Sequence, residues 1–241
     1  MTDSPPSSLN KSLPATTSRV EIDVGLRQFM VSVYNYMALG LALTGVVAYA
    51  SAESGLYASL VETPLLFWGV ALAPLALVLL LSFRIERMSL GGAQAAFWAY
   101  AAMVGLSLAG LFLVYTGMSM ARTFFITAAM FFAMSLYGYT TRTDLTSIGS
   151  FMLMGLVGII IASVVNLFLE SSAVQLAISV IGVVVFIGLT AYDTQRIKEI
   201  YLASDGSAVA GKKAIMGALA LYLDFLNLFM ILMQFTGDRR S

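Results

Sequence analysis

Seven runs of about 20 apolar residues restrict the fold of this chain more than any other feature of its sequence. A helix of that length crosses the hydrocarbon core of a bilayer, and it satisfies its own backbone hydrogen bonds there. The runs lie at residues 29–51, 64–83, 92–115, 121–139, 148–169, 173–192 and 214–235. The sequence therefore predicts an all-α integral membrane protein, built as a bundle of seven transmembrane helices.

The amino-acid composition supports the same class of protein. Of the 241 residues, 59% are hydrophobic and 11% are charged, whereas a soluble domain has about 25% charged residues. So much apolar material cannot be buried in one core surrounded by water, and we expect the lipid bilayer to surround the protein instead. The net charge is zero, which gives no reason to expect a nucleic-acid partner.

The chain contains neither cysteine nor histidine. Zinc sites are usually built from imidazole or thiolate ligands, and Ser–His and Cys–His nucleophiles need an imidazole base. These absences argue against two large classes of enzyme. We expect no enzymatic activity and no small-molecule cofactor, and the sequence identifies no set of metal ligands. A sensor of pH near neutrality would have to use a carboxylate with a perturbed pKa, because histidine is missing.

The segments outside the apolar runs define the domain organisation. Residues 1–27 are rich in serine, threonine and proline and lack the apolar core of a signal peptide, so we predict a disordered cytoplasmic tail. Residues 28–236 are predicted to form the transmembrane domain. Its longest polar segment, 193–213, has seven charged residues and is predicted to be a cytoplasmic loop.

The distribution of lysine and arginine predicts the orientation in the membrane, because short cytoplasmic loops carry an excess of both. With the N-terminus in the cytoplasm, the cytoplasmic side has Lys11, Arg19, Arg27, Arg84, Arg87, Arg142, Arg196, Lys198, Lys212 and Lys213. The opposite side then has Arg122, Arg239 and Arg240. Seven crossings place the C-terminus outside, where its two arginines fit poorly, whereas a re-entrant last segment would return it to the cytoplasm. The sequence leaves both arrangements open.

The last apolar run contains a carboxylate, Asp224, within the segment LALYLDFLNLFM. In a helix this residue belongs to a stripe of mostly small and polar residues. The stripe consists of Gly217, Ala220, Asp224, Asn227, Ile231 and Gln234. An ionised aspartate at the bilayer centre costs about 2.5–3.5 kcal/mol, so either Asp224 keeps its proton or another group pairs with it. One interpretation is a hydrogen-bonded aspartate that only holds helices together.

Asp193, at the end of the sixth apolar run, is the predicted partner of Asp224. If its helix continues past the run, Thr190, Asp193 and Arg196 lie on one face. Two carboxylates at hydrogen-bonding distance cannot both ionise cheaply, so the pair would share a proton and titrate as a unit. Asp224 lies about 15 Å along the helix from Lys213, and Asp193 is shallower. The pair therefore meets only if the two helices are offset.

The two aspartate segments, AYDTQRIKEIY and ALALYLDFLNLFMILMQF, resemble the signature of the Bax inhibitor family, also called the transmembrane Bax inhibitor motif family. The opening segment VYNYMALGLALTGVVAYA is similar to that of bacterial, YccA-like members. The likeness extends over residues 27–235. It implies a seven-helix bundle with the last helix at its centre, located in a bacterial inner membrane. The lysine and arginine counts place the N-terminus in the cytoplasm.

The resemblance also implies a function, a proton-sensitive calcium leak that is closed while an aspartate pair is hydrogen-bonded. The two aspartates correspond to Asp193 and Asp224, which are therefore the predicted pH sensor and gate, and Ca²⁺ is the transported ion. The family pairs the first aspartate with an arginine at the end of the second helix, here Arg84 or Arg87. Further residues predicted beside the gate are Arg196 as a charge and Thr190, Tyr222 and Asn227 as polar lining.

A second function remains open, because bacterial relatives of this kind include partners and inhibitors of a membrane protease. The chain would then be a membrane scaffold or inhibitor that binds a membrane protease or another membrane complex. A leak needs a polar route that reaches both sides of the membrane, whereas a regulator needs only an exposed tail or helix face. This difference separates the two hypotheses.

Two local motifs suggest enzymes, but both are incomplete. The pair Tyr192-Asp193 matches the first motif of intramembrane aspartyl proteases, but the segment around Asp224 lacks the glycines of the second, and no P-A-L motif follows. The loop GSAVAGKK begins like a P-loop and then has Lys213 where serine or threonine binds magnesium. Neither motif changes the expectation that the chain is not an enzyme.

Overall fold

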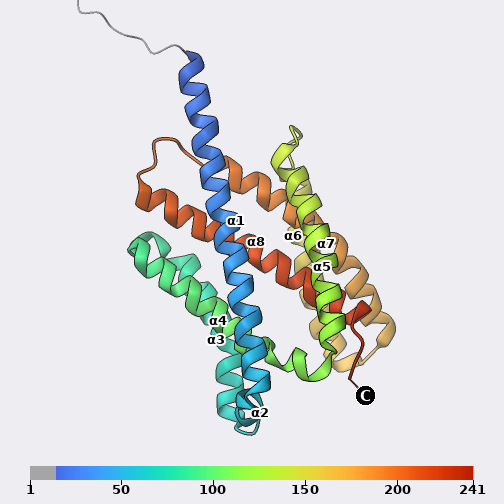
Figure 1. Ribbon diagram of the computed structural model, residues 1–241. Coiled ribbons are helices and arrows are strands. Elements are labelled where there is room, and N and C mark those ends of the chain that lie inside the picture. The colour runs from blue at the N-terminus through green and yellow to red at the C-terminus, as the bar shows by residue number, and fades with distance from the viewer. Residues whose placement is uncertain (1–14, 241) are drawn as a thin grey trace, which may run out of the picture.

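The computed structural model of the protein describes residues 15–240, with side chains from Val24 onward. Its elements are α1 (Ala15–Glu53), α2 (Leu56–Val61), α3 (Pro64–Arg84), η1 (Ile85–Arg87), α4 (Leu90–Val114), α5 (Gly117–Thr140), α6 (Thr146–Leu169), α7 (Ser172–Glu199) and α8 (Ser207–Thr236). All of the α-helices except α2 are long and apolar enough to cross a membrane. The predicted all-α bundle of seven transmembrane helices is confirmed (Figure 1).

Helix α8 occupies the centre of the bundle (Figure 1). It packs against α1, α4, α5 and α7. Of its most apolar stretch, 56% is buried within the protein, compared with none for α6 and 6% for α3. The last helix is therefore surrounded by other helices as predicted, while α3 and α6 present most of their surface to the outside.

The predicted disordered tail at 1–27 is wrong in its second half. Residues 1–14 lie outside the described residues, but α1 begins at Ala15 and runs without a break into the first membrane segment. No proline follows Pro14 in this stretch. Adding a residue to an existing helix costs far less than nucleating a new one, so the apolar segment extends its helix into the polar residues before it.

The predicted loop at 193–213 is also much shorter than expected. Helix α7 continues to Glu199 and α8 begins at Ser207, which leaves only 200–206 as a connection. The charged residues at both ends are mostly good helix formers, so the helices extend beyond their apolar lengths. Lys213 of α8 holds the connection, because its Nζ lies 2.6 Å from Asp205 Oδ2 and donates to the Ile200 carbonyl at 3.0 Å.

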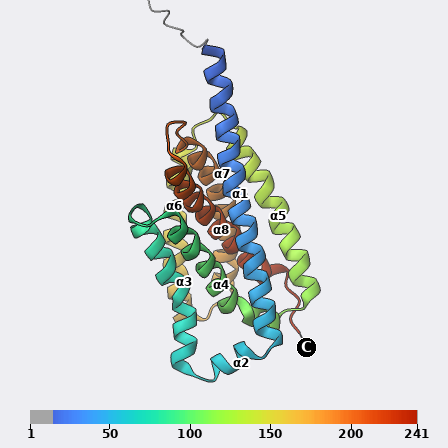
Figure 2. The same ribbon diagram turned by 60° about the vertical axis from the view of Figure 1, so that its left-hand side comes forward.

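The C-terminal residues pair with the junction between α4 and α5. The Arg240 N–H donates to the Val114 carbonyl at 2.9 Å, and the Thr116 N–H donates to the Asp238 carbonyl at 2.9 Å. Helix α8 thus runs the whole length of the bundle, and the described chain ends opposite to the start of α1 (Figure 2). The structure selects a crossing last helix over a re-entrant one.

Helices α5 and α7 approach each other closely at Gly138. A Cβ atom placed on this glycine would lie 2.1 Å from the Ala191 carbonyl oxygen and 2.9 Å from the Ala191 Cα. Small residues at helix interfaces allow backbones to come this close in membrane proteins. Gly138 therefore sets the position of the part of α7 that carries Asp193.

Candidate functional site

Helix α7 carries Asp193 toward the centre of the bundle because it continues well past its apolar run. Its first turn is capped by Ser171, whose Oγ accepts from the Val174 N–H. Near the other end, Thr190 and Thr194 are buried. Their hydroxyls donate to the carbonyls of the preceding turn, each at 2.8 Å. The Thr194 hydroxyl also lies 3.0 Å from the Ser135 hydroxyl of α5, so both threonines have partners other than the aspartates.

One face of α8 contacts α7 in an antiparallel arrangement. A Cβ on Gly217 would contact the Ile197 side chain, and the Ile231 side chain contacts Gly182. Further along, Gln234 accepts a hydrogen bond from Ser179 at 3.1 Å. Asp224 belongs to the same stripe, so it also faces α7. The small residues of the stripe are what allow the two helices to lie this close.

The carboxyl groups of Asp193 and Asp224 lie within hydrogen-bonding reach of each other between α7 and α8. The Asp224 side chain is buried, with 5% of the residue exposed, whereas Asp193 is half-buried. Among the described residues, no N–H or O–H group donates to Oδ2 of Asp224. Because both carboxylates only accept when ionised, a bond between them needs a proton on one of the two.

Helices α7 and α8 have the offset that a meeting of the two aspartates requires, because both helices extend beyond their apolar runs. Helix α7 extends six residues beyond Asp193, to Glu199, and α8 starts at Ser207, well before its apolar run. The side-chain contacts place Ile197 beside Gly217 and Gly182 beside Ile231. In this antiparallel register the two aspartates meet. Their depths in the membrane are unequal only when each depth is measured from the end of its apolar run.

Of the predicted charge partners, only Arg196 is near the pair, and it acts on Asp193 through its charge from an exposed position one turn away. Arg84 and Arg87 are exposed at the end of α3 and in η1. This turn is bonded to the start of α8, where Lys212 Nζ donates to the Glu86 carbonyl at 2.9 Å. Since Lys212 is about 18 Å along α8 from Asp224, the structure does not bring these arginines to the aspartates.

The predicted polar lining is divided among three environments. Thr190 is buried beside the pair, with its hydroxyl bonded within α7. Tyr222 is fully buried on another side of α8, where its hydroxyl and the Thr44 hydroxyl are 2.6 Å apart. Asn227 is exposed, and its Nδ2 donates to the Leu223 carbonyl at 2.8 Å. Asp224 and Gln234 lie on the face of α8 that meets α7, as the predicted stripe requires, but Asn227 is exposed.

A second polar cluster lies at the opposite end of the interface between α7 and α8. Gln234 Oε1 accepts from Gln175 Nε2 at 2.8 Å and from the Ser179 hydroxyl at 3.1 Å. Asn166 Nδ2 of α6 donates to Gln175 Oε1 at 3.3 Å. These residues are far apart in the sequence and were not predicted as a site, although amides within apolar helices are a signal of such contacts.

Within the described part of the chain, no three aspartate or glutamate side chains gather into a group suited to hold a metal ion. The aspartate pair can gain and lose protons. With one proton shared, the pair joins α7 to α8 by a charge-assisted hydrogen bond. With none, two negative charges face each other in a buried place, and repulsion favours separation of the helices.

Comparisons with known proteins agree over nearly the whole chain. The family model described as "Inhibitor of apoptosis-promoting Bax1" matches residues 26–241. The chain is 51% identical to the RP147 protein of Rickettsia prowazekii over 96% of its own length and 98% of that protein. It is 46% identical to the inner membrane protein YbhL of Escherichia coli over 94% and 98% of the two chains. It is 37% identical to a Streptococcus pyogenes membrane protein over 89% and 94%.

Proposed function

This chain belongs to the Bax inhibitor family of membrane proteins, and on that basis we propose that it is a pH-sensitive calcium leak. In this proposal Ca²⁺ moves down its gradient through the bundle, and the Asp193–Asp224 pair is both the sensor and the gate. The observation that carries the proposal is the meeting of these two carboxyl groups beside the buried centre of α8.

In the closed state the two carboxyls share one proton and hold α7 against α8. A second proton replaces the charge-assisted bond by a weaker neutral one, and loss of the only proton leaves two like charges in contact. Either change weakens the connection between the two helices. Because α8 is the central helix, its separation from α7 loosens the interior of the bundle rather than its edge.

The polar groups along α7 and α8 support a leak more than a purely regulatory surface. The aspartates lie toward one end of the interface, and the cluster of Gln175, Ser179 and Gln234 lies toward the other. Between them is a block of apolar side chains that includes Val185 and Leu228. In this arrangement a single apolar barrier separates two polar regions, and opening the interface would connect them.

The proposal is tested by measuring calcium entry into liposomes that contain the purified protein and an enclosed calcium indicator. We expect entry above that of empty liposomes, with a rate that depends on pH between about pH 6 and 8. Adding Na⁺ or Mg²⁺ in excess measures selectivity. Absence of flux at every pH would reject the leak, and the alternative of a scaffold or inhibitor of a membrane protease would then be tested by co-purification.

We also propose that the N-terminus lies in the cytoplasm and the C-terminus on the other side. Because the chain has no cysteine, single-cysteine variants report on each side of the membrane. We expect Thr143→Cys, in the α5–α6 connection, to react with a membrane-impermeant thiol reagent only after permeabilisation. Arg239→Cys should react in intact cells. The reverse pattern would contradict the orientation, and equal reactivity would contradict the crossing of α8.

A further inference from the structure

Two cavities follow each other along the gap between α1 and α5. The larger, of about 650 Å³, lies toward the N-terminal end of α1, and the smaller, of about 290 Å³, lies beyond it. Helices α1 and α5 both pack on α8 but make little contact with each other. Phe225 of α8 lines both cavities. Both cavities have residues of α1, α5 and α8 in their lining, and the smaller one also has residues of α4; we refer to the two cavities as the groove.

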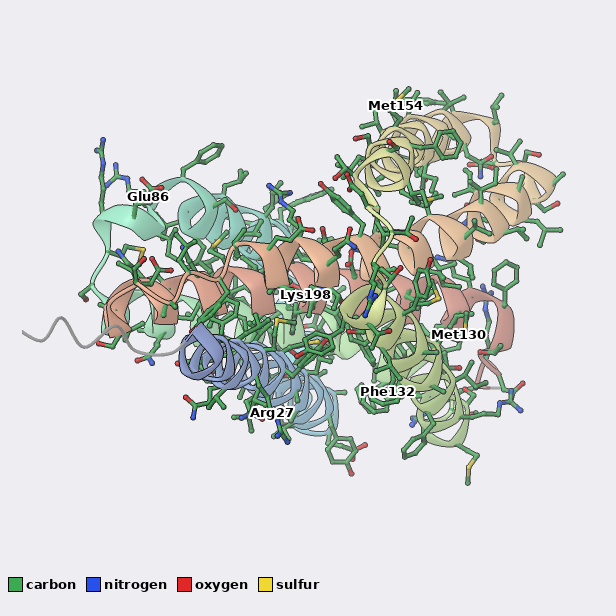
Figure 3. The ribbon with its side chains drawn as sticks, turned by 90° about the horizontal axis from the view of Figure 1, so that it is seen from above. Arg27, Glu86, Met130, Phe132, Met154 and Lys198 are labelled. Atoms are coloured by element: carbon green, nitrogen blue, oxygen red, sulfur yellow. The ribbon has the colours of Figure 1, made fainter. Side chains whose placement is uncertain are left out.

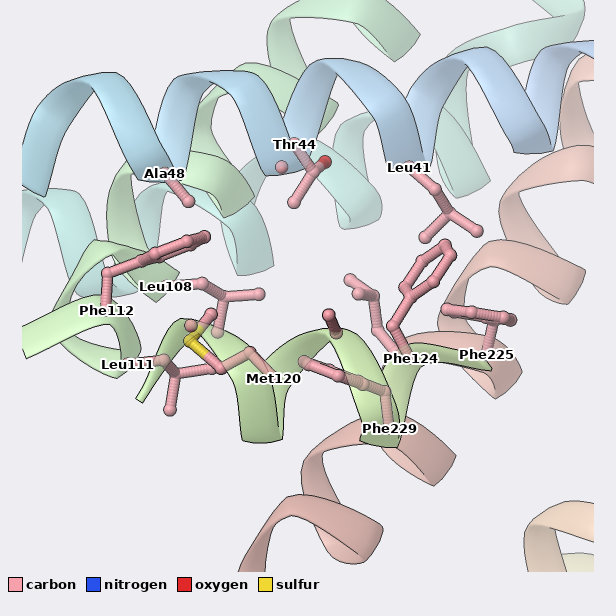
Figure 4. A pocket seen from close by; sticks show the side chains of 14 residues that line it. Leu41, Thr44, Ala48, Leu108, Leu111, Phe112, Met120, Phe124, Phe225 and Phe229 are labelled. Atoms are coloured by element: carbon pink, nitrogen blue, oxygen red, sulfur yellow. The ribbon is translucent and has the colours of Figure 1, made fainter. Parts of the chain in front are cut away.

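The smaller cavity is almost entirely apolar (Figure 4). Its polar side chain is Thr44, whose hydroxyl donates to the Ala101 carbonyl at 2.8 Å and also contacts the Tyr222 hydroxyl. Leu41, Phe124 and Phe229 from three different helices face into it (Figure 4). This part of the groove therefore offers contact area to an apolar group and has no free polar group to hold a charged one.

The larger cavity ends in a polar and positively charged mouth. Its lining includes Arg27 and Tyr34 on α1 and Ser135 and Tyr139 on α5, and among its described lining residues none is acidic. Lys198 lies behind Tyr139, with its Nζ donating to the Tyr139 carbonyl at 2.9 Å and lying 5.7 Å from the ring centroid. Seen from above, Arg27 lies on α1 and Phe132 lies on α5, the two helices that line the cavity (Figure 3). This mouth is complementary to an anion.

The dimensions of the larger cavity match one leaflet of a bilayer. The residues of α1 that line it extend from Arg27 to Ala38, a rise of about 16 Å at 1.5 Å per residue. Half of the hydrocarbon core is about 15 Å. A membrane-spanning helix, about 10 Å wide and 30 Å long, needs roughly 2,000 Å³, which exceeds both cavities. A helix of another protein therefore does not fit, whereas a lipid chain does.

We propose that this groove is a phospholipid-binding site, with an acyl chain between α1 and α5 and the phosphate group at Arg27. The apolar walls remove the chain from the disordered bilayer, and the guanidinium forms charge-assisted hydrogen bonds with the phosphate. The tyrosines suit the level of the headgroups, where aromatic side chains concentrate. The site is separate from the aspartate pair, so it stands whether or not the protein conducts calcium.

The test is native mass spectrometry of the full chain, purified in detergent and stripped of lipid, with dioleoyl phosphatidylglycerol added. We expect one tightly bound lipid per chain. Dioleoylglycerol has the same chains without the phosphate and should bind about tenfold more weakly, as should phosphatidylglycerol to the Arg27→Gln variant. Ala38→Phe, which fills the groove, should weaken binding of both lipids. Inorganic phosphate alone should not bind.

Matched controls separate the groove from the rest of the surface. Ala129→Phe makes the same change at an exposed position of α5 outside both cavities, and Arg142→Gln removes an exposed arginine from the α5–α6 connection. Both should bind lipid as the unchanged protein does. If Ala38→Phe is unstable, Arg27→Gln still tests the proposal, because its side chain is exposed. Equal binding by the groove variants and their controls, or a second protein chain bound in place of lipid, overturns it.

Discussion

Replacing Asp224 by asparagine should leave the calcium flux low and independent of pH from about pH 6 to 8. The asparagine amide can donate to the Asp193 carboxylate without a shared proton, so it imitates the state in which the pair shares one proton. The unchanged protein should instead have its lowest flux where one proton is shared, with flux rising as the pair gains the second proton or loses the first. Flux into liposomes across this pH range measures both.

Asp224→Ala should give the opposite result, a flux that is high and also independent of pH. Alanine removes the hydrogen bond between α7 and α8, which as a bond to a charged group contributes about 1.5–3 kcal/mol. The ratio of open to closed protein should then rise by roughly ten- to hundredfold. Asp193→Asn should resemble Asp224→Asn, because either member of the pair can be the donor.

The control for these variants is Glu62→Gln, which neutralises an exposed carboxylate far from the pair, in the turn between α2 and α3. Its flux should follow that of the unchanged protein at every pH. If Asp224→Asn and Asp224→Ala both keep the full pH response, the aspartates are not the sensor. They would then have only the structural role of holding α7 and α8 together.

The second large effect is expected from Gly138→Ala. The added Cβ would lie 2.1 Å from the Ala191 carbonyl oxygen, and that oxygen belongs to the backbone of α7 rather than to a flexible side chain. The two helices must separate to accept it, and overpacking of this kind costs about 1–3 kcal/mol. We expect a clearly lower midpoint of thermal unfolding in detergent, followed by the loss of helical circular dichroism.

Gly158→Ala is the matched control for Gly138→Ala. It makes the same change in α6, where a Cβ would meet nothing within 4 Å. Alanine favours a helix by about 1 kcal/mol over glycine, so the control should be as stable as the unchanged protein or more so. A Gly138→Ala protein as stable as Gly158→Ala would show that α5 and α7 do not need their close approach.

Several features of the site followed from the sequence alone because they depend on the cost of burial. A carboxylate in the middle of an apolar run is costly in a bilayer, so Asp224 was recognisable without a structure, and Asp193 was recognisable as its partner at the end of the neighbouring run. The small and polar stripe of α8 also predicted which face of the helix meets α7. Contacts at Gly217, Ile231 and Gln234 follow that prediction.

Other features depended on how the helices are offset and rotated. Tyr222 and Asn227 are both close to Asp224 in sequence, yet one is buried beside Thr44 and the other is exposed. Arg84 lies near the start of α8 rather than beside Asp193. The amide cluster at Gln234 brings together residues from three helices. The local pattern marks these side chains as polar but does not determine which of them meet.

The sequence by itself determined that the chain has seven segments long and apolar enough to cross a membrane, and which two carboxylates do not fit an apolar environment. Hydropathy is a property of each segment and its solvent, so it can be read without knowing the neighbours of that segment. Only the tertiary structure decided that α8 crosses the whole bundle, that the aspartates meet, and that a groove remains between α1 and α5. Those outcomes depend on packing between helices that are distant in the sequence, where close backbone contacts such as that of Gly138 with Ala191 set the offset of each pair.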